Sequence, residues 1–354
     1  MNMRILIITT RSCLGGAQSV VMNIANGLCS SNEVAVAAGI DDGREASILW
    51  DLLAPPVHRY KLINLVKRIS PLKDIKAAFD IRRIYKEFNP DVIHLHSSKA
   101  SVLGRIILPA KKIIYTVHGF DTIRVANRKF LLIERILQYK CKYIVCVSNY
   151  DYDNLIAEKI SHNVCVIYNG LAISPIKENN QSHLFSKEKK NILCIARVSP
   201  PKRHDLFIQI AQMLPEYHFV WIGNLFPIDK TPDNCDFVGN IPNAGAYCKF
   251  FDLFILTSDY EGLPMVIIEA MSQGLPVVSS DVGGVHEIVQ DGINGYVVPN
   301  EANLFAERIR NILGNQEVYN KMSEKSRNIY EQLLTVDKMI SKYNELYKSI
   351  ADHL

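Results

Sequence analysis

The stretch from Leu253 to Pro276 constrains the fold more than any other part of this sequence. It begins with the apolar run Leu253 to Leu256, which predicts a buried strand. Pro264 suits the first position of a helix, because no amide hydrogen is needed there and its φ is already helical. Apolar residues then recur for about three turns until Gly274, a residue typical of the end of a helix. The stretch therefore predicts a strand, a tight turn and a helix.

Two carboxylates belong to this unit. Glu261 falls in the loop before the helix and Glu269 on the helix itself. A helix N-terminus attracts anions through its unpaired amides and its dipole. Carboxylates beside such a site suggest recognition of hydroxyl groups next to a phosphate, which fits a nucleotide sugar. For Glu261 a second interpretation is a capping carboxylate at the start of the helix, and the two roles could coexist.

Glu261 and Glu269 form an E-x7-E pattern, which is weak alone because two glutamates eight apart occur by chance. Here EGLP stands at its start, EAMSQGLPVV runs through its end, and a glycine pair follows at Gly283 and Gly284. With these neighbours the chain closely resembles the retaining glycosyltransferases of family 4, enzymes of the GT-B fold. The resemblance spans most of the chain, and this C-terminal block is its most specific part.

The resemblance implies an α/β protein of two Rossmann-like domains whose parallel sheets face a central cleft. A length of 354 residues suits two domains of about 100–200 residues each, and alternating strands and helices favour parallel sheets. We expect an acceptor-binding domain at 1–170, a linker at 171–190 and a nucleotide-sugar domain at 191–335. The final helix, within 336–354, should pack back on the first domain, as it does in the family.

Composition excludes several other classes of protein. Apolar residues make up 48% of the chain, enough for two cores, and no apolar run approaches the ~18–20 residues of a membrane span. The opening strand, Arg4 to Thr9, is too short for a signal-peptide core. The eight cysteines are scattered without a C-x2-C pair, which favours reduced thiols in a cytoplasmic protein over structural zinc.

Charge is distributed unevenly along the chain. Residues 1–170 hold 23 Lys and Arg against 14 Asp and Glu, whereas the whole chain has a net charge of only +4. The segment 59–86 concentrates nine basic residues: Arg59, Lys61, Lys67, Arg68, Lys73, Lys76, Arg82, Arg83 and Lys86. It is either a solvated face over a core or a surface for an anionic membrane. Enzymes that resemble this chain often use lipid-linked acceptors; no nucleic-acid partner is expected.

A glycine pair follows the first strand. Gly15 and Gly16 lie between that strand and a helix expected from about Ala17 to Cys29. Backbone amides in such a loop can bind a phosphate, although glycine pairs are also common in ordinary turns. The family resemblance implies that Gly15 and Gly16 contact the donor diphosphate or the acceptor.

Three histidines lie in or directly after predicted strands of the first domain. His94 and His96 alternate onto one face of a strand, so they are either core histidines or a metal pair; no cysteine or carboxylate partner is near, which favours the core. His118 follows the strand Lys112 to Val117, at the end where parallel sheets bind ligands. It matches the family's His-Gly motif, whose histidine approaches the transferred sugar.

Two cations stand at the first strand–helix junction of the second domain. Arg197 and Lys202 are placed where a diphosphate leaving group needs positive charge in the transition state. They match the family's Arg…Lys pair, but Arg203 replaces the glycine that usually follows the lysine. Gly223 and Gly239 resemble the family's strand-end turns that line the nucleotide site.

These assignments give a predicted mechanism. The resemblance implies retention of anomeric configuration without a metal or other cofactor, so Arg197, Lys202 and loop amides would neutralise the departing diphosphate. Glu269 would hold the ribose hydroxyls and Glu261 would orient the donor sugar and phosphate. Nothing resembling an Asp-x-Asp metal site stands in a suitable place, and the Asp41-Asp42 pair lies in a weakly placed loop. The remaining expected substrate-binding residues are Gly262, Leu263, Pro264, Met265 and Val266.

The predicted activity is hexosyl transfer from a nucleotide sugar, a UDP-hexose or UDP-N-acetylhexosamine, to a glycan or lipid-linked saccharide of a cell-surface polysaccharide. Two alternatives stay open: a nucleotide-sugar epimerase of the same fold, and a catalytically inactive partner subunit. The Arg197–Lys202 pair together with EGLP argues against an epimerase. The presence of both cations and both glutamates argues against a catalytically inactive subunit. The expected location is the cytoplasm, with peripheral contact at the inner membrane face if segment 59–86 binds lipid.

Overall fold

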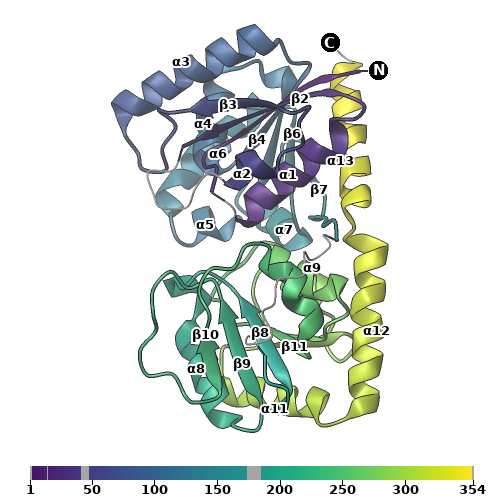
Figure 1. Cartoon of the computed structure of the whole chain (residues 1–354). Helices are drawn as coiled ribbons and strands as arrows, with labels where there is room; N and C mark the ends of the chain where they lie inside the picture. The colour runs from purple at the N-terminus through teal and green to yellow at the C-terminus, as the bar shows by residue number, and fades with distance from the viewer. Residues whose placement is uncertain (1, 14, 41–47, 174–184, 353–354) are drawn as a thin grey trace. The chain divides into compact units, whose positions relative to one another are not determined.

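The computed structural model describes residues 2–13, 15–40, 48–173 and 185–352 (Figure 1). The chain divides into two compact units: unit 1 comprises 1–170 and 336–354, and unit 2 comprises 171–335. Asp41-Asp42 and most of the expected linker, at 174–184, lie outside the described residues.

Unit 1 is built on a parallel sheet, in which the described residues form seven strands ordered β3-β2-β1-β4-β5-β6-β7. The strands are β1 (Arg4–Thr9), β2 (Glu33–Gly39), β3 (His58–Leu62), β4 (Val92–His96), β5 (Ile113–Val117), β6 (Tyr143–Cys146) and β7 (Val164–Val166). β1, β4 and β5 are buried almost throughout. Their near-continuous apolar runs are typical of parallel strands covered on both faces.

Helices cover both faces of this sheet. They are α1 (Gly16–Leu28), α2 (Ile48–Leu52), α3 (Pro71–Phe88), α4 (Ser98–Ile107), α5 (Asp121–Arg124), α6 (Leu131–Leu137), α7 (Asn149–Ala157) and α13 (Val336–Ala351). Residues of α3, α4 and α6 pack in one cluster with alternate strand residues such as Leu95 and Tyr115. His94 and Thr116 therefore face the other side, where α13 packs through Tyr343 and Tyr347.

Unit 2 has its own parallel sheet, in which the described residues give the order β10-β9-β8-β11-β12-β13. Its strands are β8 (Asn191–Ile195), β9 (His218–Ile222), β10 (Cys235–Phe237), β11 (Leu253–Leu256), β12 (Val277–Ser280) and β13 (Gly295–Val298). Its α-helices are α8 (His204–Met213), α9 (Met265–Ser272), α10 (Val285–Ile288), α11 (Ala302–Leu313) and α12 (Gln316–Leu333). The predicted fold of two α/β domains with parallel sheets is confirmed.

Some expected boundaries were wrong. Pro264 is the residue before α9, with ψ 119°, and not its first helical residue. The helix then runs for eight residues, fewer than the three turns expected, and Gly274 follows it in the left-handed region at φ 74°. The basic segment 59–86 is divided: β3 ends at Leu62, and α3 begins only at Pro71.

Two further observations concern membrane-spanning helices and the cysteines. No helix in the described parts of the chain combines the length and the apolarity needed to cross a membrane. All eight cysteines are free thiols, and six of them are buried. The pKa of the Cys194 thiol is raised by burial, so this sulfur is held as an unreactive core group.

Candidate functional site

The predicted site residues fall into two groups, one in each unit. The smaller group belongs to unit 1 and consists of Gly15, Gly16 and His118. The larger group belongs to unit 2 and consists of Arg197, Lys202, Gly223, Gly239, Glu261, Gly262, Leu263, Pro264, Met265, Val266 and Glu269. The residues of the unit 2 group come after strands β8, β9, β10 and β11 in the chain. These strands are neighbours in a parallel sheet, so their carboxyl ends lie along one edge, where α/β sheets bind ligands.

The turn that carries Lys202 is held against the end of β11. This turn, η5 (Pro200–Lys202), is a single turn of 3-10 helix. The Thr257 hydroxyl donates to the carbonyl oxygens of Lys202 and Arg203, each at 3.1 Å. The Asp259 amide donates to the carbonyl oxygen of Pro201 at 2.8 Å. These three bonds bring Lys202 beside the loop that contains Glu261.

Lys202 and Glu261 form an ion pair through Nζ and Oε1. The same Oε1 accepts a hydrogen bond from the Ser258 hydroxyl at 2.8 Å. The two side chains are only 25% and 12% exposed, respectively. Glu261 is therefore turned toward Lys202, and α9 begins without a side-chain cap, so the capping interpretation was wrong. Ser258 was not singled out from the sequence, and nothing in its local pattern distinguishes it from other turn serines.

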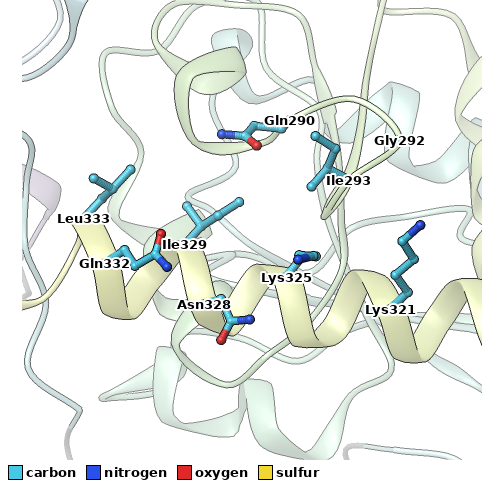
Figure 2. A pocket seen from close by; sticks show the side chains of 9 residues that line it. All are labelled: Gln290, Gly292, Ile293, Lys321, Lys325, Asn328, Ile329, Gln332 and Leu333. Atoms are coloured by element: carbon cyan, nitrogen blue, oxygen red, sulfur yellow. The ribbon is translucent and has the colours of Figure 1, made fainter.

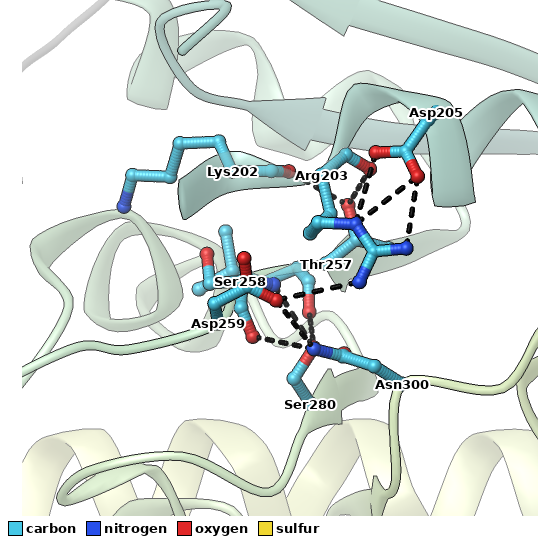
Figure 3. A network of polar contacts seen from close by, with 9 residues as sticks. Lys202, Arg203, Asp205, Thr257, Ser258, Asp259, Ser280 and Asn300 are labelled. Atoms are coloured by element: carbon cyan, nitrogen blue, oxygen red, sulfur yellow. Dashed lines mark hydrogen bonds and ion pairs between the residues drawn. The ribbon is translucent and has the colours of Figure 1, made fainter. Parts of the chain in front are cut away.

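Arg203 occupies a backbone conformation that favours glycine, with φ 44° and ψ 53°. Its guanidinium pairs with Asp205 at 2.8 Å and with Asp259 at 3.4 Å (Figure 3). Asn300 joins the network by donating to Asp259 Oδ1 at 3.2 Å. The hydrogen bond from Arg203 lowers the pKa of Asp205. These contacts explain how an arginine is tolerated where the family usually has glycine.

Arg197 is exposed, and within the described part of the chain it has no hydrogen bond or ion pair. The backbone around it is packed closely. A Cβ on Gly223, whose φ is 121°, would lie 2.5 Å from the Ala196 carbonyl oxygen. The Gly223 amide in turn donates to the Gly239 carbonyl oxygen at 2.7 Å. The two glycines thus place bare backbone beside a cation that has no protein partner there.

Glu269 lies on α9 in different surroundings from Glu261. Its carboxyl group packs beneath Gly245, where an added Cβ would stand 2.4 Å from Cδ. Burial raises the pKa of the Glu269 carboxyl to about 7. No residue of the described chain pairs with this carboxyl or donates a hydrogen bond to it. Gly245 was missed in the sequence because no strand or helix was expected around it; it lies in η6 (Ala244–Phe250).

The glycine pair after β12 supports the loop that carries Glu261. A Cβ on Gly283, at φ 57°, would stand 2.0 Å from the Glu261 carbonyl oxygen. The Gly284 amide donates to the Gly262 carbonyl oxygen at 2.9 Å. Leu263, Pro264 and Met265 are buried beneath this loop and Val266 is half-buried. The glycine pair therefore has a local structural explanation, because the two loops contact each other through their backbones.

In unit 1, His118 follows β5 and its Nε2 lies 2.8 Å from Nδ1 of His96. Burial lowers the pKa of His118 to about 4, so its ring is neutral near pH 7. Gly15 precedes α1 in an extended conformation, and Gly16 is the first residue of that helix. Both nitrogens of His94 contact side-chain hydroxyls, of Tyr347 and Thr116, so His94 is a core residue. No group of three or more His, Cys, Asp and Glu among the described residues could hold a metal.

A hollow of about 450 Å³ lies elsewhere on unit 2, between α12 and the turn after α10 (Figure 2). It is lined by Gln290, Gly292, Ile293, Lys321, Lys325, Asn328, Ile329, Gln332 and Leu333. It contains none of the predicted site residues. Its lysines extend from the exposed side of α12, which is typical of a solvated helix face.

Two family descriptions match consecutive parts of the chain. "Glycosyltransferase Family 4" matches residues 14–174, and "Glycosyl transferases group 1" matches residues 175–329. Together they match residues 14–329, which include every predicted site residue. The chain belongs to the family 4 glycosyltransferases, and its fold is of the GT-B type.

Similar proteins include enzymes of bacterial surface polysaccharides. The chain is 26% identical to the UDP-Gal:alpha-D-GlcNAc-diphosphoundecaprenol alpha-1,3-galactosyltransferase of Escherichia coli, over 86% of this chain and 87% of that protein. It is 27% identical to the O-antigen biosynthesis glycosyltransferase WbnH of Escherichia coli, over 97% of both. It is 29% identical to an uncharacterized 41.2 kDa protein in the cps region of Klebsiella pneumoniae, over 75% and 80%.

Solved structures support the same fold. The Anabaena protein HepE in complex with UDP and glucose superposes with a TM-score of 0.79 at 21% identity, covering 98% of this chain and 100% of that chain. The sucrose-phosphate synthase of Thermosynechococcus elongatus superposes with a TM-score of 0.83 at 17% identity, covering 99% of both. At these identities the likeness concerns the fold.

Proposed function

We propose that this glycosyltransferase moves a hexosyl or N-acetylhexosaminyl group from a UDP-sugar, with retention, to a glycan or lipid-linked saccharide in cell-surface polysaccharide synthesis. The observation that carries the proposal is the edge of unit 2 where Lys202, Glu261 and Arg197 follow neighbouring parallel strands. The names of the Escherichia coli relatives support the class of acceptor, and the UDP complexes of HepE support the donor nucleotide.

In this proposal Lys202 and Arg197 hold the donor diphosphate. Lys202 is paired with Glu261, so its charge is fixed near the site. Arg197 has no protein partner within the described residues and is available to an anion. As the glycosidic bond breaks, negative charge grows on the diphosphate, and fixed cations stabilise that charge without rearranging.

Glu269 binds the ribose of the donor. A carboxylate with no protein donor can accept hydrogen bonds from two hydroxyl groups, and a ribose offers such a pair. Glu261, held by Lys202 and Ser258, orients the sugar and its phosphate. From unit 1, Gly15 and Gly16 offer backbone amides to the diphosphate or acceptor, and His118 meets the transferred sugar.

Metal-independent transfer is part of the proposal. The charge of the leaving diphosphate is balanced by Arg197, Lys202 and loop amides, so activity should persist in EDTA. The Asp41-Asp42 pair lies outside the described residues. Loss of activity on chelation, with recovery on adding Mg²⁺ or Mn²⁺, would overturn it.

The test is turnover by purified protein with a panel of UDP-sugars, with and without a diphospholipid-linked saccharide. A transferase gives product only when acceptor is present, and the anomeric configuration of that product, read by NMR, decides retention. An epimerase would convert the donor without any acceptor, and an inactive partner subunit would do neither.

Lys202→Ala tests the diphosphate site within this assay. Its kcat should fall by about 10²-fold or more, the scale for removing one group that stabilises transition-state charge. The matched control is Lys190→Ala, which removes another lysine of unit 2, one paired with Asp252 at 2.8 Å. Near-normal kcat in Lys202→Ala would remove the main support for the proposed site.

A second part of the proposal concerns the membrane. On α3 the face toward the core consists of Ala77, Ile81, Ile84 and Phe88, yet Leu72 and Phe79 on the other side are 78% and 70% exposed. Exposed lysines flank them, among them Lys73 and Lys76. Apolar side chains beside basic ones suit the surface of an anionic bilayer. We propose that this face of α3 brings the enzyme to its lipid-linked acceptor.

A further inference from the structure

His118 is the outer member of a row of histidines that leads into unit 1. Its Nε2 lies 2.8 Å from Nδ1 of His96, and the two rings are stacked with centroids 5.1 Å apart. His96 is fully buried at the end of β4. The contact between the two rings therefore joins a half-buried candidate site residue to a buried one.

The inner end of the row is held by the C-terminal helix. The His94 ring lies 4.0 Å from the His96 ring, measured between centroids. Nδ1 of His94 is 2.6 Å from the Tyr347 hydroxyl, and its Nε2 is 2.7 Å from the Thr116 hydroxyl. Both nitrogens of His94 are thus occupied, which fixes its ring. His96 packs between a fixed ring and His118, so its own orientation is restricted.

The proton positions follow from what surrounds His96. Burial lowers the pKa of all three histidines, so each carries one ring proton near pH 7. Nε2 of His96 is buried and has no partner among the described residues. Buried N–H groups without an acceptor are rarer than acceptors without a donor. The proton of His96 is therefore on Nδ1, where it donates to Nε2 of His118, and the proton of His118 is on Nδ1.

We propose that His96 is a positioning residue that fixes the tautomer and the ring plane of His118, so that His118 presents Nδ1–H as a hydrogen-bond donor. An oxygen atom of the transferred sugar is the partner that such a donor suits. This inference rests on the proposed function, in which His118 meets that sugar. It assigns His96 a role in the reaction, although His96 itself need not touch the substrate.

The test is the protonation state of the His118 nitrogens in full-length protein labelled with ¹⁵N, read from long-range ¹H–¹⁵N NMR correlations. In the wild type, Nδ1 of His118 should be protonated and Nε2 should be bare. His96→Leu removes the donor, so both His118 tautomers should then be populated. His96→Asn, which retains an amide N–H close to the original Nδ1, should restore part of the wild-type pattern.

Kinetics on the same variants separate positioning from binding. His96→Leu should lower kcat by about tenfold or more, the loss expected when a fixed donor to the reacting sugar becomes variable, and His96→Asn should recover part of it. The affinity for free UDP should not change, because neither His96 nor His118 is among the proposed nucleotide contacts. His162→Leu is the matched control, since His162 belongs to unit 1 and its ring contacts Tyr139, with centroids 5.1 Å apart, and no member of the row.

The outcomes are distinguishable. A wild-type His118 protonated at Nε2, or a tautomer unchanged in His96→Leu, would overturn the inference whatever the activity. If the tautomers behave as expected but no donor is turned over, the proposed function fails and the assignment of the proton stands. If both variants lose activity while the His118 tautomer is preserved in each, His96 acts in another way and the positioning role is wrong.

Discussion

At the scale of single residues, Glu261 and Glu269 are eight positions apart in sequence and have opposite surroundings. Glu261 is bound by a lysine and a serine, whereas the Glu269 carboxyl lies beneath Gly245 without a partner in the described chain. A carboxylate already paired with a cation is suited to orienting charge at the diphosphate. A carboxyl that lacks a donor is suited to accepting hydrogen bonds from a ligand. Mutation of Glu261 and mutation of Glu269 should therefore change different kinetic and binding constants.

Glu269→Gln should weaken binding of the donor and of the released nucleotide alike, raising KM together with the inhibition constant for UDP. Glu261→Gln should leave UDP affinity near normal and lower kcat. The first pattern is a loss of uniform binding, and the second is a loss felt in the transition state. Calorimetry with UDP and steady-state rates on both variants measure the split. Reversed behaviour would exchange the two roles, and full activity in both would make the motif structural.

The raised pKa of Glu269 predicts a pH dependence of stability. The folded protein holds this proton up to about pH 7, whereas an unfolded glutamate loses it near its ordinary pKa of 4.5. The folded state therefore binds more protons between these values, and its stability falls as the pH rises through this window. Glu269→Gln, which stays neutral, should have a higher Tm than the wild type at about pH 8, and the difference should become much smaller at about pH 5.

The control for this prediction is Glu261→Gln. That change removes an ion pair with Lys202 and should not raise the Tm at any pH. Thermal unfolding followed by circular dichroism between about pH 5 and pH 8 compares the variants. If the Tm difference between Glu269→Gln and the wild type is the same at about pH 5 and about pH 8, the Glu269 carboxyl is already ionised in the folded protein.

Sequence patterns located the residues whose chemistry is visible in their type and spacing, and missed those that act through tertiary contact. Glu261 and Glu269 could be named from the E-x7-E pattern, and Arg197 and Lys202 from their place at a strand–helix junction, with the family resemblance behind both. Gly245 packs on Glu269 from a segment 24 positions earlier, and no short-range pattern links the two. His96 could be placed on a strand, yet its contact with His118 depends on the pairing of β4 with β5.

At the scale of elements, strands were easier to predict than short turns and helix ends. The cores of β1 and β11 are continuous apolar runs, which few other structures explain. The start of α9 was misplaced by one residue because Pro264 is compatible with both the last extended and the first helical position. The turn η5 was not expected, since Pro200 and Pro201 indicate a break in structure without giving its shape.

The exposed face of α3 carries a prediction about membranes. Leu72→Asp combined with Phe79→Asp should reduce co-sedimentation with vesicles containing anionic lipid, because both changes remove apolar contact and add repulsion. Charge reversal at Lys67 and Arg68, in the exposed turn before α3, should also reduce it. Binding of the wild type should weaken as salt is added.

The matched control for the membrane prediction is Leu333→Asp, which places an acid on a 43% exposed leucine of unit 2. Its vesicle binding should equal that of the wild type. If the wild type ignores anionic vesicles even at low ionic strength, the basic residues of 59–86 form only a solvated face. If neutral vesicles bind it equally well, apolar contact alone is responsible and the lysines have no part.

At the scale of the whole molecule, the chain passes from unit 1 to unit 2 and returns to unit 1 in its last helix. α13 buries Met339, Tyr343, Tyr347 and Ile350 in unit 1. These residues recur at spacings of three and four, so one stripe of the helix faces the sheet. Tyr343 and Tyr347 also satisfy the buried hydroxyl of Thr116 and the buried ring of His94. Unit 1 is therefore incomplete until the end of the chain has been made.

Removing α13 should consequently destabilise unit 1 and leave unit 2 nearly unchanged. A chain ending at Thr335 should lose amide-exchange protection in β4 and β5, while β8 and β11 keep theirs. Tyr347→Phe is the milder test, because it keeps the ring and leaves Nδ1 of His94 without its partner, at a cost of about 1–3 kcal/mol. The control is Tyr319→Phe in unit 2, whose hydroxyl has no hydrogen bond in the described chain. Equal loss of protection in both units would mean that they unfold as one body, and unchanged protection in β4 would show that α13 is dispensable.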